Sequence, residues 1–186
     1  FNTIYEKAKW KIISIYKTNT LESQGEFFNY LRGTFETESD FMNYIYQVRA
    51  RSIIDCPVDV NEDDTLVTLS TCAYDFDQFR FVVVARRVRE GETAKVDTST
   101  AKMASNPVYP DCWYEAYGGK KPVLTSFEEA LAAKQITWYD NPHKKKWNAS
   151  EAQKEATKKA EEQKKKEEEA SKAAEKASKL KSAKAE

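Results

Sequence analysis

Two runs rich in β-branched residues limit most strongly what this chain can fold into. The first run covers residues 65–72 (TLVTLSTC) and the second covers residues 80–88 (RFVVVARRV). Valine and threonine favour an extended backbone, because their branched side chains fit the pleated surface of a sheet. The seven residues between the two runs form a connection of hairpin length. The sequence therefore predicts two antiparallel strands joined in a hairpin.

The predicted hairpin brings Cys72 and Arg80 to the same end of one sheet. In an antiparallel pair, the last residue of the first strand lies near the first residue of the second. A neighbouring guanidinium favours the thiolate form of a cysteine, and the thiolate is the nucleophile. For an arbitrary strand cysteine, a small buried apolar side chain is the competing interpretation. The position opposite Arg80 instead predicts that Cys72 is reactive.

These residues also resemble the active-site hairpin of class B sortases. The resemblance rests on Thr-Leu-Ser-Thr-Cys at residues 68–72 and on Arg-Phe-Val-Val-Val-Ala-Arg at residues 80–86. Class B sortases are cysteine transpeptidases that attach proteins to the cell wall of Gram-positive bacteria, or to each other in pili. The resemblance covers roughly the first 120 residues. It implies a mainly β fold with helices, containing part of a sortase-type β-barrel.

The resemblance also implies roles for individual residues. Cys72 would be the nucleophile, and Arg80 would stabilise the oxyanion or hold the substrate backbone. Ser70 shares a face with Cys72 by strand alternation and would donate to the bound peptide, with Thr71 as a further contact. Tyr30 and Leu31 match a family position in the substrate groove, and core packing is the alternative for both.

The implied partners are a sorting-signal peptide and an amine of a cell-wall precursor or a pilin. The implied location is the extracellular face of the cell membrane, held by an N-terminal anchor that this sequence does not contain. No cofactor is expected, because zinc-type cysteine spacing is absent and the chain has one histidine. Nucleic acid is not an expected partner either, because the predicted globular part carries no basic stripe.

Further patterns predict the elements around the hairpin. Residues 9–17 form a strand in which Trp10, Ile12, Ser14 and Tyr16 share one face. A short extended piece over residues 52–54 gives about four strands in total. Residues 40–50 carry apolar side chains at helical spacing, so an amphipathic helix precedes the cysteine strand, with Ser39 or Asp40 as its N-cap.

The second half of the chain predicts less regular structure. Residues 93–122 indicate an irregular wrap, with a helical turn at residues 111–117. Ser126 and Glu129 match a capping box that begins a short helix over residues 127–134. Three cysteines allow one disulfide at most, and sequence cannot place Cys56 and Cys112 within bonding distance.

Charge divides the chain into two parts. The net charge is +5 from Lys144 onwards and −5 before it. Residues 148–186 are almost entirely alanine, lysine and glutamate, which predicts a long solvated helix or a disordered tail. We therefore expect a sortase-like domain over residues 1–125, a short helix and linker over 126–147, and the charged tail over 148–186.

The catalytic histidine of the family is missing from its expected place. The family places an acid–base histidine well upstream of the cysteine, whereas the one histidine here is His143, which we interpret as a solvated loop residue. The chain is then either the C-terminal part of a longer sortase or a degenerate homologue, and we expect it to be inactive alone. The alternatives are a non-catalytic surface binding or scaffold module and, more weakly, a papain-like hydrolase.

Overall fold

The computed structural model describes residue 2 and residues 4–147, so the predicted charged tail over 148–186 lies outside the described residues. Residues Phe1–Lys145 form one compact unit. Three strands build its main sheet, in the order β1-β4-β3. These strands are β1 (Trp10–Thr18), β3 (Leu66–Cys72) and β4 (Arg80–Arg87). Two further strands, β2 (Ile54–Asp55) and β5 (Lys102–Met103), pair with each other.

The predicted hairpin is confirmed, because β3 and β4 pair antiparallel from Leu66–Arg86 to Cys72–Arg80. The described part of the chain has five strands rather than about four, since no sequence pattern indicated the two-residue strand β5. Neither described sheet closes into a barrel, and β3 is an edge strand. The expectation of a mainly β fold with helices is confirmed, with the sheet as part of an open structure.

Three α-helices accompany the sheet: α1 (Glu38–Ala50), α2 (Asp111–Tyr117) and α3 (Phe127–Ala132). Two short 3-10 helices lie at Glu22–Gln24 and Thr98–Thr100. The predicted N-cap of α1 is wrong by two or three positions, because Thr37 accepts the capping hydrogen bond from the Asp40 N–H at 3.1 Å. The capping box of Ser126 and Glu129 is confirmed, although α3 ends two residues earlier than predicted.

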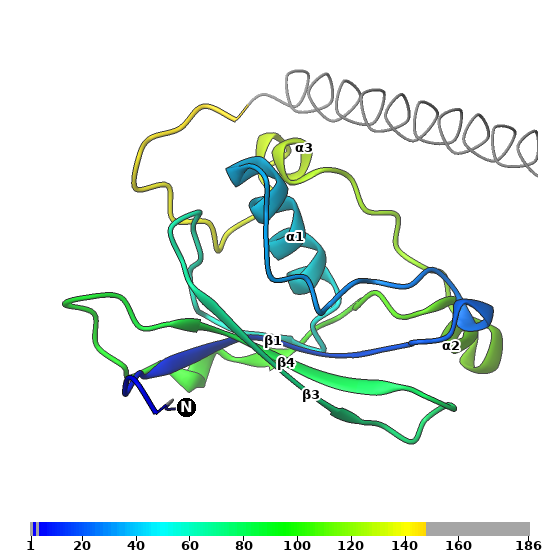
Figure 1. Cartoon of the computed structure of the whole chain (residues 1–186). Helices are drawn as coiled ribbons and strands as arrows, with labels where there is room; N and C mark the ends of the chain where they lie inside the picture. Colours follow the sequence, from blue (N-terminus) through cyan, green and yellow to red (C-terminus); the bar gives the residue numbers. More distant parts are fainter. Residues whose placement is uncertain (1, 3, 148–186) are drawn as a thin grey trace, which may run out of the picture. The chain divides into compact units, whose positions relative to one another are not determined.

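Helices α1 and α3 lie over one face of the sheet (Figure 1). The Ser14 hydroxyl joins β1 to α1 by donating to the Val48 carbonyl at 2.8 Å. The Phe127 N–H joins α3 to α1 by donating to the Asn43 side-chain oxygen at 2.8 Å. These contacts place the buried core between the helices and the sheet.

A β-bulge changes which side chains of β1 face that core. The pairing of β1 with β4 shifts register between Ile12 and Ser14. Ile13 and Ser14 are both buried as a result, whereas Ile12 is 44% exposed. The prediction that Trp10, Ile12, Ser14 and Tyr16 share one face is therefore wrong. Trp10 and Ile12 lie on the face opposite to that of Ser14 and Tyr16. A bulge inserts one residue into a strand and reverses the alternation beyond it.

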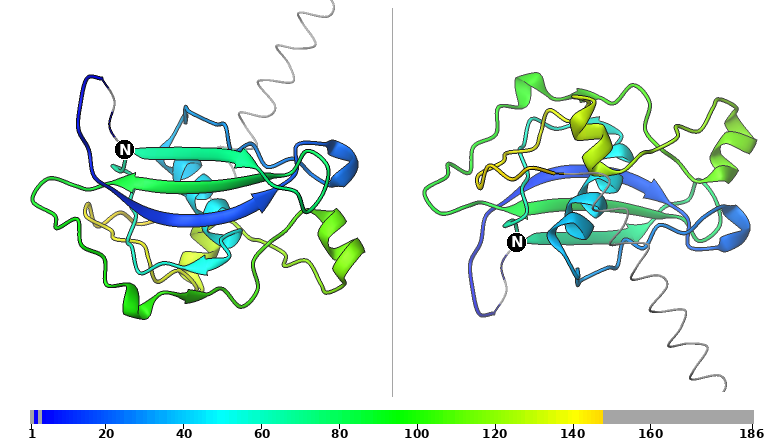
Figure 2. Two further views of the ribbon diagram at one scale, coloured as in Figure 1. Left: turned by 90° about the horizontal axis from the view of Figure 1, so that it is seen from below. Right: turned by 90° about the horizontal axis from the view of Figure 1, so that it is seen from above.

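The other face of the sheet is apolar and open. Seen from below in Figure 2 (left), no described helix lies in front of the three strands. The strand register places Leu69, Val83 and Ile15 in one row across this face. Leu69 is 48% exposed there. Both faces of the sheet thus carry apolar side chains, but helices among the described residues cover only one of them.

An ion cluster closes the end of the sheet opposite Cys72. Arg86 is fully buried and donates to both carboxylate oxygens of Glu92 at 2.8 Å, and to Asp59 at 3.1 Å. Arg89 donates to both carboxylate oxygens of Asp64 at 2.8 Å. Lys11 from β1 also pairs with Glu92. We call this group the Arg86 cluster.

The Arg86 cluster should make the fold sensitive to acid. Hydrogen bonds from Arg86 hold the pKa of Glu92 well below its usual range. A carboxyl group whose pKa is lowered by folding stabilises the protein fully above its unfolded pKa of about 4.3. That stabilisation is lost as the pH falls below this value toward the folded pKa. We expect the free energy of unfolding, measured by urea titration, to decrease from about pH 5 downwards.

The variant Glu92→Gln should weaken this decrease, because its side chain does not titrate. The matched control is Glu90→Gln, since Glu90 is an exposed side chain two residues away. An equally steep decrease in Glu92→Gln and in the unmodified chain would contradict the assignment of the acid sensitivity to Glu92.

Candidate active site

The register of the hairpin places Cys72 directly opposite Arg80. Directly opposite residues have Cα atoms about 4.5–5.5 Å apart, and their side chains leave the same face of the sheet. Ser70 is opposite Val82 and lies on that face as well. Because Val82 and Val84 on this face are fully buried, it is the face that the helices cover. The structure thus brings Cys72, Arg80 and Ser70 together.

The loop between β3 and β4 is held by several contacts. The Ala73 N–H donates to the Phe79 carbonyl at 3.0 Å. Phe79 is fully buried, and its ring centroid lies 4.9 Å from that of Phe76. Gln78 adopts a left-handed backbone with φ of 56°, and its carbonyl accepts from the Thr20 hydroxyl at 2.8 Å. These contacts fix the end of the hairpin where Cys72 and Arg80 lie.

The Arg80 guanidinium turns toward this loop. Its Nη1 donates to the Gln78 carbonyl at 3.1 Å and to the Phe79 carbonyl at 3.0 Å. Among the described residues, no carboxylate forms an ion pair with it. The Cys72 thiol is exposed, and all three cysteines are free thiols. An exposed thiol on the residue opposite an arginine suits a nucleophile and an oxyanion-stabilising group, although the guanidinium here bonds to the loop carbonyls.

A groove of about 470 Å³ runs along the same face of β3. Thr68 and Ser70 form its floor, while Tyr30 and Leu31 line it from the loop before α1. Tyr30 is 5% exposed and Leu31 is 71% exposed, so the tyrosine is part of the core and the leucine faces solvent. The predicted residues Ser70, Tyr30 and Leu31 therefore meet in one groove.

Thr71 does not join them. It is opposite Phe81, on the open face of the sheet, and it does not line the groove. Strand alternation separates it from Ser70 and Cys72 on either side. The structure thus gives no support to Thr71 as a substrate contact through its side chain.

Sequence reasoning missed several groove residues: Arg32, Phe35, Tyr44 and Thr68. Thr68 could have been found, because it lies two positions before Ser70 and therefore on the same face. The other three residues come from the loop before α1 and from α1 itself, and no local signal relates them to β3. The Arg32 guanidinium packs over the Phe35 ring at 4.8 Å.

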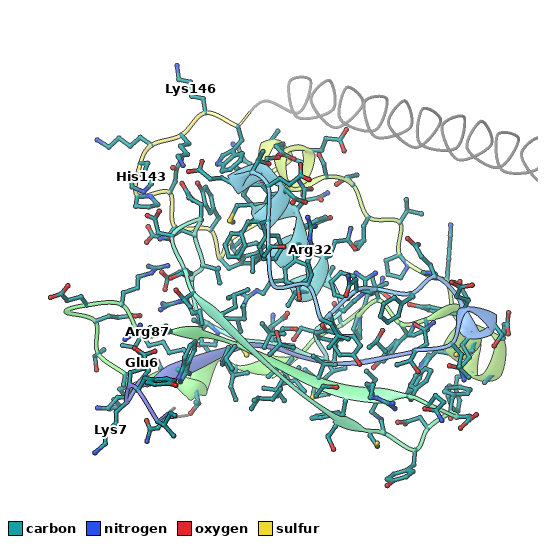
Figure 3. All side chains as sticks on the ribbon, in the orientation of Figure 1. Glu6, Lys7, Arg32, Arg87, His143 and Lys146 are labelled. Carbon is teal, nitrogen blue, oxygen red and sulfur yellow. The ribbon has the colours of Figure 1, made fainter. Side chains whose placement is uncertain are left out.

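His143 lies far from Cys72. Its Nε2 is 2.5 Å from a carboxylate oxygen of Asp63, which precedes the start of β3, whereas Cys72 ends that strand. Six residue steps separate the two ends of β3, and at about 3.3 Å per residue this corresponds to roughly 20 Å. Figure 3 shows His143 on the segment that leads to Lys146. His143 is half-exposed, in agreement with a solvated loop residue.

The described residues show neither a metal cluster nor a membrane span. No group of three histidine, cysteine or acidic side chains among them could hold a metal ion. None of the described helices combines the length and the apolar character needed to cross a bilayer.

Comparison with known proteins relates the chain to one group of enzymes. Sortase B of Staphylococcus aureus is 34% identical over 91 residues. Half of this chain is homologous to class B sortases. The match covers 48% of the chain but 35% of the sortase, so the chain spans about a third of the length of this curated relative. No protein-family model matches the sequence.

Solved sortase B structures give similar coverage. The crystal structure of S. aureus sortase B is 34% identical with a TM-score of 0.39, covering 46% of this chain and 38% of the sortase. Sortase B of Clostridium perfringens is 31% identical with a TM-score of 0.38, covering 45% and 44%. The homology to sortase B therefore rests on the sequence match and not on these superpositions.

Proposed function

We propose that this chain carries the nucleophile and part of the substrate groove of a class B sortase-like transpeptidase. The observation that carries the proposal is the cross-strand pair of Cys72 and Arg80, at the end of a groove lined by Ser70. The sequence match to S. aureus sortase B supports a transpeptidase of this type at the level of the family. The site would act at the extracellular face of a Gram-positive membrane.

The proposed reaction is acyl transfer in two steps. The Cys72 thiolate attacks the threonine carbonyl of a sorting signal, a C–S bond forms, and the C–N bond breaks to release the downstream peptide as an amine. A second amine, from a cell-wall precursor or a pilin, then attacks the thioester and releases the thiolate. Arg80 donates to the oxygen that carries negative charge in both steps. One matched sortase B structure is described as a substrate complex, and another as a complex with triglycine.

The groove would bind the sorting peptide alongside β3. Thr68 and Ser70 offer hydroxyl groups along its floor, and exposed Leu31 offers apolar contact at its rim. A peptide along the groove would run beside β3, whose last residue is Cys72. Such a peptide would present a carbonyl to the thiol at the end of the strand.

The proposed reaction also needs an acid–base group near Cys72. An acid–base group must protonate the leaving amine, and the one histidine of this chain is bonded to Asp63 at the far end of β3. We therefore expect the chain to bind and capture a sorting peptide but not to turn it over. Turnover comparable to a complete sortase, measured with a peptide and an amine acceptor, would contradict this expectation.

A sorting peptide that carries a thiol-reactive group tests the nucleophile. We expect intact mass spectrometry to show one adduct at Cys72, formed at least about tenfold faster than with a scrambled peptide. Cys72→Ala should remove the adduct, and Arg80→Gln should slow its formation. Cys56 and Cys112 provide internal controls, because both are partly buried thiols. Equal labelling by the sorting and scrambled peptides would contradict a specific groove.

The distance between Cys72 and His143 also favours a second candidate, a non-catalytic binding module derived from a sortase. This module would use the groove but not the thiol, so Cys72→Ala would leave peptide binding and function intact. The papain-like alternative loses support, because such enzymes place the cysteine at the start of a helix and Cys72 ends a strand.

A further inference from the structure

A second cavity, of about 350 Å³, shares no lining residue with the groove. Four separate parts of the chain enclose it: the end of β1, residues 26–28, the C-terminal turn of α1, and residues 108–124. Phe28, Val108 and Leu124 provide apolar walls. Its volume lies within the range of small-molecule sites, and its lining is more polar than apolar.

Arg51 brings a positive charge to this cavity. Its Nη1 donates to the Gln47 carbonyl at 3.0 Å and to the Gln47 side-chain oxygen at 2.6 Å, and its guanidinium lies 4.1 Å above the Phe28 ring. Among the described residues, no carboxylate lies within ion-pair distance of it. Burial lowers the pKa of Arg51, because it disfavours the charged form, while the charge of Glu26 acts in the opposite direction. An anionic ligand would relieve this cost.

Asn19 brings an unused acceptor. Its side chain is fully buried, and its amide nitrogen donates to the Leu21 carbonyl at 2.9 Å and to the Gly25 carbonyl at 2.8 Å. These two carbonyls fix the orientation of the amide. The Asn19 side-chain oxygen then has no hydrogen-bond donor among the described residues. Because this oxygen also has almost no accessible surface, Asn19 forms part of the cavity wall and is not itself a contact for a ligand.

The remaining charges limit the ligand to a single negative charge. Lys17 and Lys121 also line the cavity, but they pair with Asp75 at 2.6 Å and with Asp111 at 2.7 Å. Arg51 is therefore the cation left over, and the exposed Glu26 lines the same cavity. A dianion such as phosphate would be repelled by Glu26, whereas a zwitterion has a partner for each of its charges.

We propose that this cavity binds an amino acid or a short peptide as a zwitterion, with its carboxylate on Arg51 and its amino group on Glu26. The planar guanidinium suits a carboxylate, which can accept two parallel hydrogen bonds. The side chain of the ligand would lie against Phe28 and Leu124. This binding is independent of the chemistry proposed for Cys72.

Glycylglycine is the probe for this proposal, added to the full chain and followed by ¹⁵N NMR. We expect saturable shifts of the Arg51 side-chain signal and of the amides of Phe28 and Val108. Acetate and ethanolamine, which each carry one of the two charges, should bind at least about tenfold more weakly. Shifts that do not saturate, or that acetate reproduces at the same concentration, would overturn the proposal.

Two variants locate the binding. Arg51→Gln should weaken glycylglycine binding at least about tenfold, and Leu124→Trp should block the cavity by filling it while keeping Arg51. The matched control is Arg87→Gln, because Arg87 is an arginine outside the cavity. The proposal fails if glycylglycine binds equally to the unmodified chain and to either cavity variant that retains a folded spectrum.

Discussion

Replacing Arg86 with methionine should lower the free energy of unfolding by about 3–5 kcal/mol. Arg86 is fully buried and serves two carboxylates at once, those of Asp59 and Glu92. Methionine can fill much of the same space, but it leaves Glu92 and Asp59 without their shared partner. Removing the buried member of an ionic group is costly, because Glu92 and Asp59 lose their hydrogen bonds to Arg86 and keep only Lys11 and Arg89 as cationic partners among the described residues. Urea unfolding monitored by circular dichroism would measure the loss.

The neighbouring residue provides a matched control. Arg87 pairs with Glu6 at 3.0 Å, but both side chains are nearly half exposed, and Figure 3 shows them together at the edge of the molecule. Arg87→Met should change the free energy of unfolding by no more than about 1 kcal/mol, because exposed ion pairs contribute little. Similar losses in the two variants would show that burial of the Arg86 cluster does not govern its contribution.

Replacing Phe79 with alanine should also cost about 3–5 kcal/mol of stability. The Phe79 side chain is fully buried and contacts Phe76, which in turn contacts Trp113 of α2. The truncation removes apolar contacts and leaves a cavity that the surroundings fill only in part. Thermal or urea unfolding would measure the effect.

The same variant should affect the proposed site. The Phe79 carbonyl accepts hydrogen bonds from the Ala73 N–H and from Arg80, so a loosened loop would no longer hold Arg80 opposite Cys72. We expect slower labelling of Cys72 by the thiol-reactive sorting peptide at a temperature where the variant is folded. Tyr74→Ala is the control, since Tyr74 in the same loop is 95% exposed. A stability change beyond about 0.5 kcal/mol in this control would argue against burial as the cause.

Sequence patterns predicted the elements that depend on local chemistry. The hairpin, the helix before it and the capping box of α3 each follow from residues a few positions apart. The predictions of secondary structure were wrong or incomplete where a contact between distant segments determines the structure. The bulge in β1 depends on its pairing with β4, and strand β5 exists only because Lys102–Met103 meets β2. A two-residue strand has no periodicity of its own from which it could be predicted.

The candidate site also has a part that the sequence predicted and a part that depends on contacts between distant segments. The pairing of Cys72 with Arg80 was predictable, because a short loop fixes the register of a hairpin. The groove was only partly predictable, since it needs a loop some forty residues upstream to lie over β3. Thr71 shows the limit of a motif, because adjacent residues in one motif point to opposite faces of a strand.

The sequence by itself determined that Cys72 and Arg80 are paired across one end of a hairpin, because strand propensity and loop length are local properties. Tertiary structure alone decided that Arg86 is the buried centre of an ion cluster, that His143 lies at the far end of β3, and that Arg51 and Asn19 share a cavity. Each of these arrangements joins segments distant in the chain. Such contacts form only when the whole core packs, and no spacing along the sequence encodes them.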